Sequence, residues 1–167
     1  MSRLCKIDFN VSVLKESVLE NLQNYKQHFV INGYGRRFFP FVQIDKEYVS
    51  NVFSKFGIFE FYDEPKFGHF IGNHFLENAY TEPHTDMKGD GYSHVRCNIP
   101  LVLPEKGGNP TVNGVEFDID EDHMWIIFAS EEIHGSTPIS NGERVIMSLG
   151  AYVPSNLIPE LMQKYTV

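Results

Sequence analysis

The feature that most constrains the fold is a change in the spacing of apolar residues at Gly57. Before this residue, apolar side chains recur every three or four positions, which is typical of amphipathic helices. After it, short alternating runs are separated by turn residues, which is typical of strands. Helices followed by a series of short strands predict an antiparallel barrel or jelly roll braced by N-terminal helices.

Two helices are predicted before Gly57. The first covers about residues 13 to 30 and ends at Asn32-Gly33, and its apolar face consists of Leu14, Val18, Leu22, Tyr25 and Phe29. The second extends from Asp45, as N-cap, to Phe56, and Gly57 ends it. Its inward face consists of Tyr48, Val49, Val52, Phe53 and Phe56.

Strands are predicted at 58–62, 77–86 (interrupted by Pro83), 93–103, 125–129 and 144–153. Residues 111–117 form a hairpin with Asn113-Gly114 at its tip, the strongest short-range hairpin signal. With 167 residues and no internal linker, the chain is predicted to be a single domain, 1–167. Within it, residues 1–56 are the helical N-terminal support and residues 57–155 the jelly-roll core.

Charge and composition exclude several classes of partner. The net charge of −8, from 22 acidic and 14 basic residues, argues against nucleic-acid binding, which needs a basic face. No apolar run is long enough to span a bilayer, and the N-terminus lacks the apolar stretch of a signal peptide. Cys5 and Cys97 match no zinc spacing and are expected to be free thiols. We therefore expect a cytoplasmic protein without a nucleic-acid or membrane partner.

The sequence His84-Thr85-Asp86 is the first part of a candidate metal site. Side chains two apart on a strand share a face, so His84 and Asp86 can bind one ion while Thr85 points away. His134, followed by Gly135, supplies a third ligand 48 residues beyond Asp86. Two histidines and a carboxylate are the ligand set of mononuclear iron(II) oxygenases. The His-x-Asp pair is weak on its own, because a chain of this composition produces it readily by chance.

Two arginines extend this pattern. Arg96 alternates with apolar residues, so it shares one polar strand face with His94 and Asn98. This face lines a lumen beside the metal or, alternatively, lies in solvent. Arg144 begins a strand that is apolar on both faces, where a buried guanidinium needs an anionic partner. That partner is a protein carboxylate, such as Glu116 or Asp118, or a carboxylate of a bound substrate.

Taken together, these features resemble the iron(II)/2-oxoglutarate-dependent dioxygenases. The resemblance covers about residues 70 to 153 and is closest to the aspartyl/asparaginyl β-hydroxylase and proline cis-hydroxylase branch. It rests on the order of several features: His84-x-Asp86, Arg96 in "RCNIPLVLP", Gly107-Gly108, Asn113-Gly114, "WIIFA" before His134, and Arg144. The resemblance implies a mainly β fold with a double-stranded β-helix (cupin-like jelly roll) at its core.

The resemblance also implies roles for individual residues. His84, Asp86 and His134 would bind iron(II) and form the catalytic centre, and Arg144 would hold the distal carboxylate of 2-oxoglutarate. Arg96 would assist at the co-substrate or the substrate. Many relatives carry a hydroxyl two residues after the arginine, where this chain has Ile146. The expected substitutes for that hydroxyl are Asn73, Asn98 and Ser136.

The function expected from these residues is hydroxylation of an amino acid or peptide side chain, with dioxygen consumed and succinate and carbon dioxide released. Two alternatives stay open: a cupin-like metalloprotein with other chemistry, and a non-catalytic jelly-roll binding module. The expected partner is a small-molecule or peptide substrate, and a homodimer through the N-terminal helices is possible.

Overall fold

The computed structural model describes residues 3–24, 30–31, 35–40, 44–60, 62–63 and 65–165. Its helices are α1 (Ser12–Asn24), α2 (Lys46–Ser54), the 3-10 helix η1 (Ile58–Glu60) and α3 (Ile158–Gln163). Its strands are β1 (Leu4–Lys6), β2 (Val30–Ile31), β3 (Arg36–Pro40), β4 (Lys66–Phe75), β5 (Tyr92–Val102), β6 (Lys106–Gly107), β7 (Pro110–Val112), β8 (Val115–Glu116), β9 (His123–Ile127), β10 (His134–Ser136), β11 (Ile139–Asn141) and β12 (Arg144–Pro154). Within these residues no helix is long and apolar enough to cross a bilayer.

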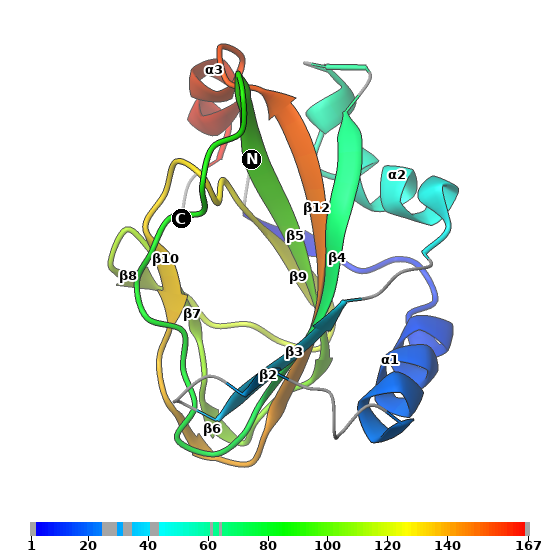
Figure 1. Cartoon of the computed structure of the whole chain (residues 1–167), viewed down its shortest axis with the longest axis vertical. Helices are drawn as coiled ribbons and strands as arrows, with labels where there is room; N and C mark the ends of the chain where they lie inside the picture. Colours follow the sequence, from blue (N-terminus) through cyan, green and yellow to red (C-terminus); the bar gives the residue numbers. More distant parts are fainter. Residues whose placement is uncertain are drawn as a thin grey trace.

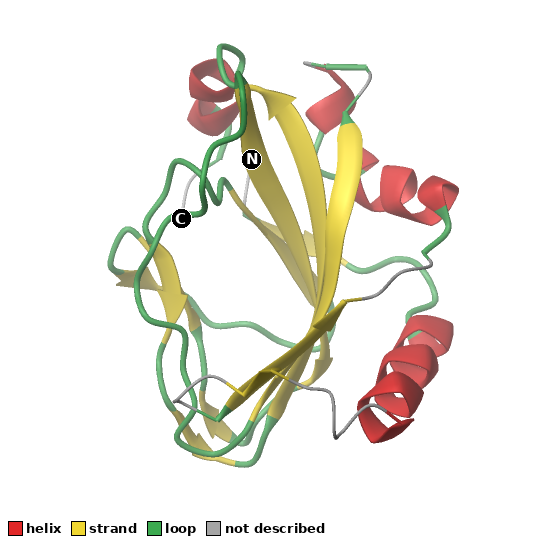
Figure 2. Cartoon of the chain, viewed as in Figure 1, coloured by secondary structure: helices red, strands yellow, loops and turns green. Residues whose placement is uncertain are grey.

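Antiparallel sheets form the body of the molecule, and α1 and α2 lie on one side of it (Figures 1 and 2). The large sheet has seven strands in the order β1-β9-β5-β12-β4-β3-β2. Facing it are a three-stranded sheet, β10-β7-β8, and a two-stranded sheet, β11-β6. This arrangement is a mainly β jelly roll, as predicted.

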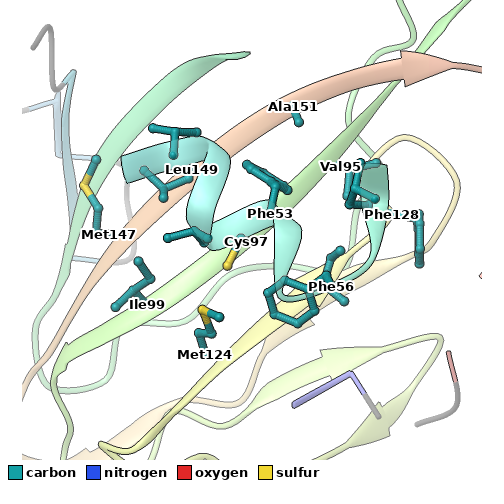
Figure 3. Packing of buried hydrophobic residues seen from close by; sticks show 14 of the residues in the cluster. Phe53, Phe56, Val95, Cys97, Ile99, Met124, Phe128, Met147, Leu149 and Ala151 are labelled. Carbon is teal, nitrogen blue, oxygen red and sulfur yellow. The ribbon is translucent and has the colours of Figure 1, made fainter. Parts of the chain in front are cut away.

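The large sheet separates two apolar clusters. On its outer face, Met147 and Leu149 of β12 pack with Phe53 of α2 and with Phe56, which lies two residues after that helix (Figure 3). On its inner face a smaller cluster lies between the sheets and includes Phe75, Val112, Trp125, Ile127 and Ile146. Because side chains alternate along β12, Arg144, Ile146 and Ser148 face this lumen while their neighbours face the helices. The sequence pattern of one strand therefore supplies both a core and a polar cavity wall.

The predicted helices are mostly confirmed. The side chain of Asp45 caps α2 by accepting a hydrogen bond from the backbone N–H of Glu47, at 2.9 Å, and Gly57 follows the helix with φ of +62°. The prediction that the first helix reaches residue 30 is wrong, because α1 ends at Asn24 and Val30 belongs to β2. Its predicted stop, Asn32-Gly33, and residues 25–29 lie outside the described residues.

Among the predicted strands, the hairpin and the long strands near 93–103 and 144–153 are confirmed. Asn113 and Gly114 have φ of +51° and +81°, as a two-residue hairpin turn with both central residues left-handed requires. The strand predicted at 58–62 is wrong, because residues 58–60 form η1 and Ile58 is buried against the outer core. A five-residue segment such as this one is too short for its pattern to distinguish a strand from one helical turn.

The strand predicted at 77–86 is also wrong. This segment is a loop with a turn at Glu77 and Asn78, and only His84 makes an isolated bridge within it. Conversely, the ten-residue β4 was not predicted, and β1, β2 and β3 add further strands from the N-terminal third to the large sheet. A bulge in β4 at His69, whose φ is +55°, interrupts the alternation that would have revealed the strand.

Candidate metal centre

The three predicted metal ligands converge at one end of the lumen. His134 begins β10, and His84 forms an isolated antiparallel bridge with it, with N–H···O distances of 3.0 and 2.8 Å. Two residues further on, the backbone N–H of Asp86 donates to the carbonyl of Ala129 at 2.7 Å. The loop that carries His84 and Asp86 is therefore fixed to the segment that carries His134.

Backbone carbonyls determine which ring nitrogen of each histidine is available. Nδ1 of His84 lies 2.8 Å from the carbonyl of Glu82, and Nδ1 of His134 lies 3.1 Å from the carbonyl of Glu132. A carbonyl only accepts hydrogen bonds, so both Nδ1 atoms carry the proton, and in the neutral ring Nε2 has a lone pair. Nε2 of His134 is buried and has no hydrogen-bond partner among the described residues.

Asp86 completes the group. Its Oδ1 lies 3.6 Å from Nε2 of His84 and 3.9 Å from Nε2 of His134, and the three ligand atoms all lie within 4.8 Å of one another. Bonds from a first-row metal to such ligands are about 2.0–2.2 Å long, so a bound ion requires only a small inward movement of the three side chains. The ligand types, the aligned lone pairs and the unpartnered Nε2 all fit a divalent metal ion.

The protonation states suit metal binding. Burial lowers the pKa of His134 to about 4, against the opposing effect of its hydrogen bond to Glu132, so the ring is neutral near pH 7. Burial alone would raise the pKa of Asp86, but its contacts with His84 and His94 and the charge of Arg96 hold the pKa well below its usual range. The site therefore presents neutral imidazole and ionised carboxylate, the forms that bind metals.

Arg144 lies in the lumen beyond the metal ligands. Its guanidinium donates to the carbonyl of Gly108 and, at 3.2 Å, to Oγ of Ser136, and it lies 4.2 Å from the centroid of the Phe75 ring. The same Oγ accepts from the backbone N–H of Thr81 at 3.0 Å. Within the described part of the chain these are the contacts of the Ser136 hydroxyl, and in both of them it accepts, so its own proton can be donated to a bound anion.

One cavity connects the two halves of the site. It is lined by His84 and His134 from the metal site, by Arg144, and by Arg96 and Trp125 of the large sheet. Asn98 and Asn73 lie on the same wall, bridged by Ser148, whose Oγ donates to Asn98 at 2.6 Å and accepts from Asn73 at 3.2 Å.

The predicted polar strand face therefore faces the lumen and not solvent. Arg96 pairs with Oδ2 of Asp86 at 2.8 Å. Glu116 and Asp118, the alternative partners suggested for Arg144, are exposed and accept hydrogen bonds from Asn109. The alternation of β5 predicted that His94 shares a face with Arg96. The contact between His94 and Asp86 was not predicted and is seen in the structure.

No protein-family model matches the sequence, and no curated protein matches it significantly. Among solved structures, the fold is similar to the viral collagen prolyl hydroxylase vCPH from Paramecium Bursaria Chlorella virus-1 in its 2OG complex, with a TM-score of 0.65 and 16% identity. The match covers 90% of this chain and 96% of the hydroxylase.

Two further solved structures have a fold similar to that of this chain. A Pseudomonas putida prolyl-4-hydroxylase matches with a TM-score of 0.65 and 16% identity over 90% of this chain and 91% of its own. HygX from Streptomyces hygroscopicus, with nickel, 2-oxoglutarate and hygromycin B bound, matches with a TM-score of 0.63 and 14% identity over 91% of this chain and 82% of its own. The chain thus has the jelly-roll fold of the iron(II)/2-oxoglutarate dioxygenases.

Proposed function

We propose that the protein is an iron(II)- and 2-oxoglutarate-dependent dioxygenase that hydroxylates an amino acid or peptide side chain. The observation that carries the proposal is the convergence of His84, Asp86 and His134 on one point, beside a cavity that Arg144 also lines. The similarity of the fold to two prolyl hydroxylases and to HygX supports it, since vCPH and HygX were solved with 2-oxoglutarate bound.

Each residue has a distinct task in this proposal. His84, Asp86 and His134 would hold the iron from one side and leave the remaining positions open. Arg144 would bind the distal carboxylate of 2-oxoglutarate, with the proton of Ser136 as a second donor in place of the hydroxyl missing at Ile146. When bound, the iron would activate dioxygen, one atom of which goes to succinate and one to the hydroxylated product while carbon dioxide is released.

The substrate class proposed is a small molecule or a peptide segment. The side chain of His84 is 42% exposed, so the metal-binding end of the site opens toward solvent. The acidic net charge of −8 disfavours a nucleic acid. The two cysteines are free thiols, which is consistent with our expectation of a cytoplasmic protein.

The test is a sequence of additions to the metal-free protein under anaerobic conditions. Iron(II) is added first and 2-oxoglutarate second, and the fluorescence of Trp125, the single tryptophan of the chain, reports each step because its side chain lines the cavity. Dioxygen is then admitted and succinate is measured. We expect 2-oxoglutarate to bind, to yield succinate only with iron present, and to yield none in His84→Ala.

Two outcomes would contradict the proposal and favour the alternatives. Iron binding without any affinity for 2-oxoglutarate would indicate a cupin-like metalloprotein with other chemistry. Failure to bind any divalent metal at His84, Asp86 and His134 would indicate a non-catalytic module.

A further inference from the structure

The two carboxylate oxygens of Asp86 have different surroundings. Oδ1 faces the two ligand nitrogens, at 3.6 Å from His84 and 3.9 Å from His134. Oδ2 points away from them and contacts Nδ1 of His94 at 2.9 Å and Nη2 of Arg96 at 2.8 Å. Only one oxygen of this carboxylate is therefore directed at the candidate metal position.

We propose that His94 is a positioning residue which, together with Arg96, holds Oδ2 of Asp86 away from the metal, so that Asp86 binds through Oδ1 alone. The inference rests on the proposed metal centre and adds a function for a residue outside the ligand set. A carboxylate that binds through both oxygens occupies two coordination positions. Holding Oδ2 leaves one of these positions open for the co-substrate and dioxygen.

The hydrogen bond between His94 and Asp86 has a defined direction. An ionised carboxylate only accepts, so Nδ1 of His94 carries the proton and donates it to Oδ2. Nε2 of the same ring is buried and has no hydrogen-bond partner among the residues that the structure describes. The contact with Asp86 is therefore the polar interaction that this buried ring makes.

The ring of His94 is held in place by packing on two sides. Tyr152 stacks on it, with ring centroids 4.9 Å apart and an interplanar angle of 15°. Gly150, in the neighbouring strand, leaves room for the ring, because a Cβ there would lie 2.5 Å from Nε2 of His94 and 2.3 Å from the carbonyl of Gly68. A residue with a side chain at position 150 would therefore clash with both the imidazole and the backbone of β4.

The backbone ties His94 to the loop that carries Asp86. The N–H of His94 donates to Oγ of Ser130 at 2.9 Å, and this hydroxyl donates to the carbonyl of Met87 at 3.3 Å. Asp86 itself is bound to the adjacent Ala129. The turn at Ala129 and Ser130 therefore anchors both the strand that carries His94 and the loop that carries Asp86.

The experiment compares two substitutions at His94 with cobalt(II) as the probe. Leucine fills similar space without a donor, whereas the amide nitrogen of asparagine stands close to the position of Nδ1. We expect His94→Leu to weaken cobalt binding by about 10- to 100-fold, the usual effect of losing a partner of a metal ligand, and to change the visible spectrum of the bound ion. His94→Asn should recover most of the affinity and the wild-type spectrum.

The matched control is His123→Leu. His123, the first residue of β9, also pairs with an aspartate through Nδ1, at 2.7 Å from Asp120 in the β8–β9 connection, but it is not one of the residues that line the cavity. This variant should bind cobalt as the wild type does. Thermal unfolding of each metal-free variant separates a local effect from a loss of fold.

Three results are decisive. If wild type binds cobalt, Asp86→Ala does not, and His94→Leu binds as tightly as wild type, the inference about His94 is overturned while the metal centre stands. Equal losses in His94→Leu and His94→Asn would overturn it as well, because packing and not donation would then be responsible. If wild type does not bind cobalt, the proposed metal centre itself fails.

Discussion

Two backbone carbonyls set the tautomer and the orientation of the two histidines in the candidate site. The carbonyls of Glu82 and Glu132 each accept a hydrogen bond from Nδ1 of the histidine two residues later in the chain, at 2.8 and 3.1 Å. Both imidazoles are therefore oriented with Nε2 toward Asp86 before any ligand binds. Such preorganisation removes the cost of rotating the rings during binding.

The depressed pKa of His134 predicts a pH-dependent stability of the metal-free protein. In the unfolded chain this histidine takes up a proton below about pH 6.5, whereas in the folded protein it does so only below about pH 4. The stability present above pH 6.5 is therefore lost as the pH falls from 6.5 to 4, by up to about 3 kcal/mol. Urea unfolding across this range measures it. His134→Asn should reduce the slope; an unchanged slope would refute the assignment.

Arg144 and Ser136 predict how 2-oxoglutarate is held. Arg144→Ala should weaken its binding by at least about 30-fold, equivalent to about 2 kcal/mol, because a buried charged contact is lost. Ser136→Ala should weaken it by about tenfold through loss of one donor to a carboxylate. Titration calorimetry with the metal-loaded protein measures both. Ser140→Ala, at an exposed serine, is the control. Equal affinity for 2-oxoglutarate in all three variants would show that its carboxylate does not bind beside Arg144 and Ser136.

At this scale the sequence predicted which residues could form a metal site but not their contacts. The grouping of His84, Asp86 and His134 follows from residue types and order. The contact of His94 with Asp86 depends on the relative position of a loop and a strand, which local spacing does not determine. The same holds for Ser136, which reaches Arg144 across the lumen from a different sheet.

Among the elements, the N-terminal strand β1 and the residue before it support the turn that leads to His134. Arg3, immediately before it, pairs through its two terminal nitrogens, Nη1 and Nη2, with Glu132, and both side chains are more than 90% buried. Glu132 also accepts from the backbone N–H of Phe128 at 3.0 Å. The turn between β9 and β10, which ends at His134, is thus fixed by a residue 129 positions away from Glu132 in the sequence.

Breaking this pair should be costly. Arg3→Met leaves Glu132 buried and charged, so we expect the free energy of unfolding to fall by about 3–5 kcal/mol. Arg3→Met combined with Glu132→Gln should recover part of this loss. Chemical denaturation measures both. Lys55→Met, which breaks the exposed pair with Asp8, should cost at most about 1 kcal/mol; equal losses at the two sites would contradict the supporting role of Arg3.

A close approach between β10 and the ligand loop gives another prediction. A Cβ at Gly135 would lie 2.8 Å from the carbonyl of Thr81, just before His84. Gly135→Ala should therefore displace this loop, lower stability by about 1–3 kcal/mol and weaken metal binding. Gly89→Ala is the control, because nothing lies within 4 Å of a Cβ there. Thermal unfolding and cobalt titration check both, and unchanged metal binding in Gly135→Ala would show that the loop adapts.

Elements with a clear local signal were predictable, and the others were not. The capped helix α2, the Asn113-Gly114 hairpin and the long apolar strands β5 and β12 each carry their own pattern. Strand β4 does not, because its inner face is partly polar and a bulge interrupts its alternation at His69. Strands β1 and β3 are three and five residues long and depend on their neighbours in the sheet.

In the molecule as a whole, the main apolar core and the candidate site lie on opposite faces of the large sheet. The outer cluster under the helices contains most of the large buried apolar side chains, among them Phe53, Phe56 and Phe128. The inner face carries fewer apolar residues and the polar groups of the cavity. The fold can therefore hold buried charges such as Arg144 in the lumen, because the apolar packing that stabilises the domain lies elsewhere.

The most direct test of the account is a crystal structure of the protein grown anaerobically with iron(II) and 2-oxoglutarate, with the metal located by anomalous scattering. We expect one metal ion about 2.0–2.2 Å from Nε2 of His84, Oδ1 of Asp86 and Nε2 of His134. We also expect a carboxylate of 2-oxoglutarate to lie against Arg144. A metal ion bound elsewhere, or no metal between these three side chains, would contradict the account.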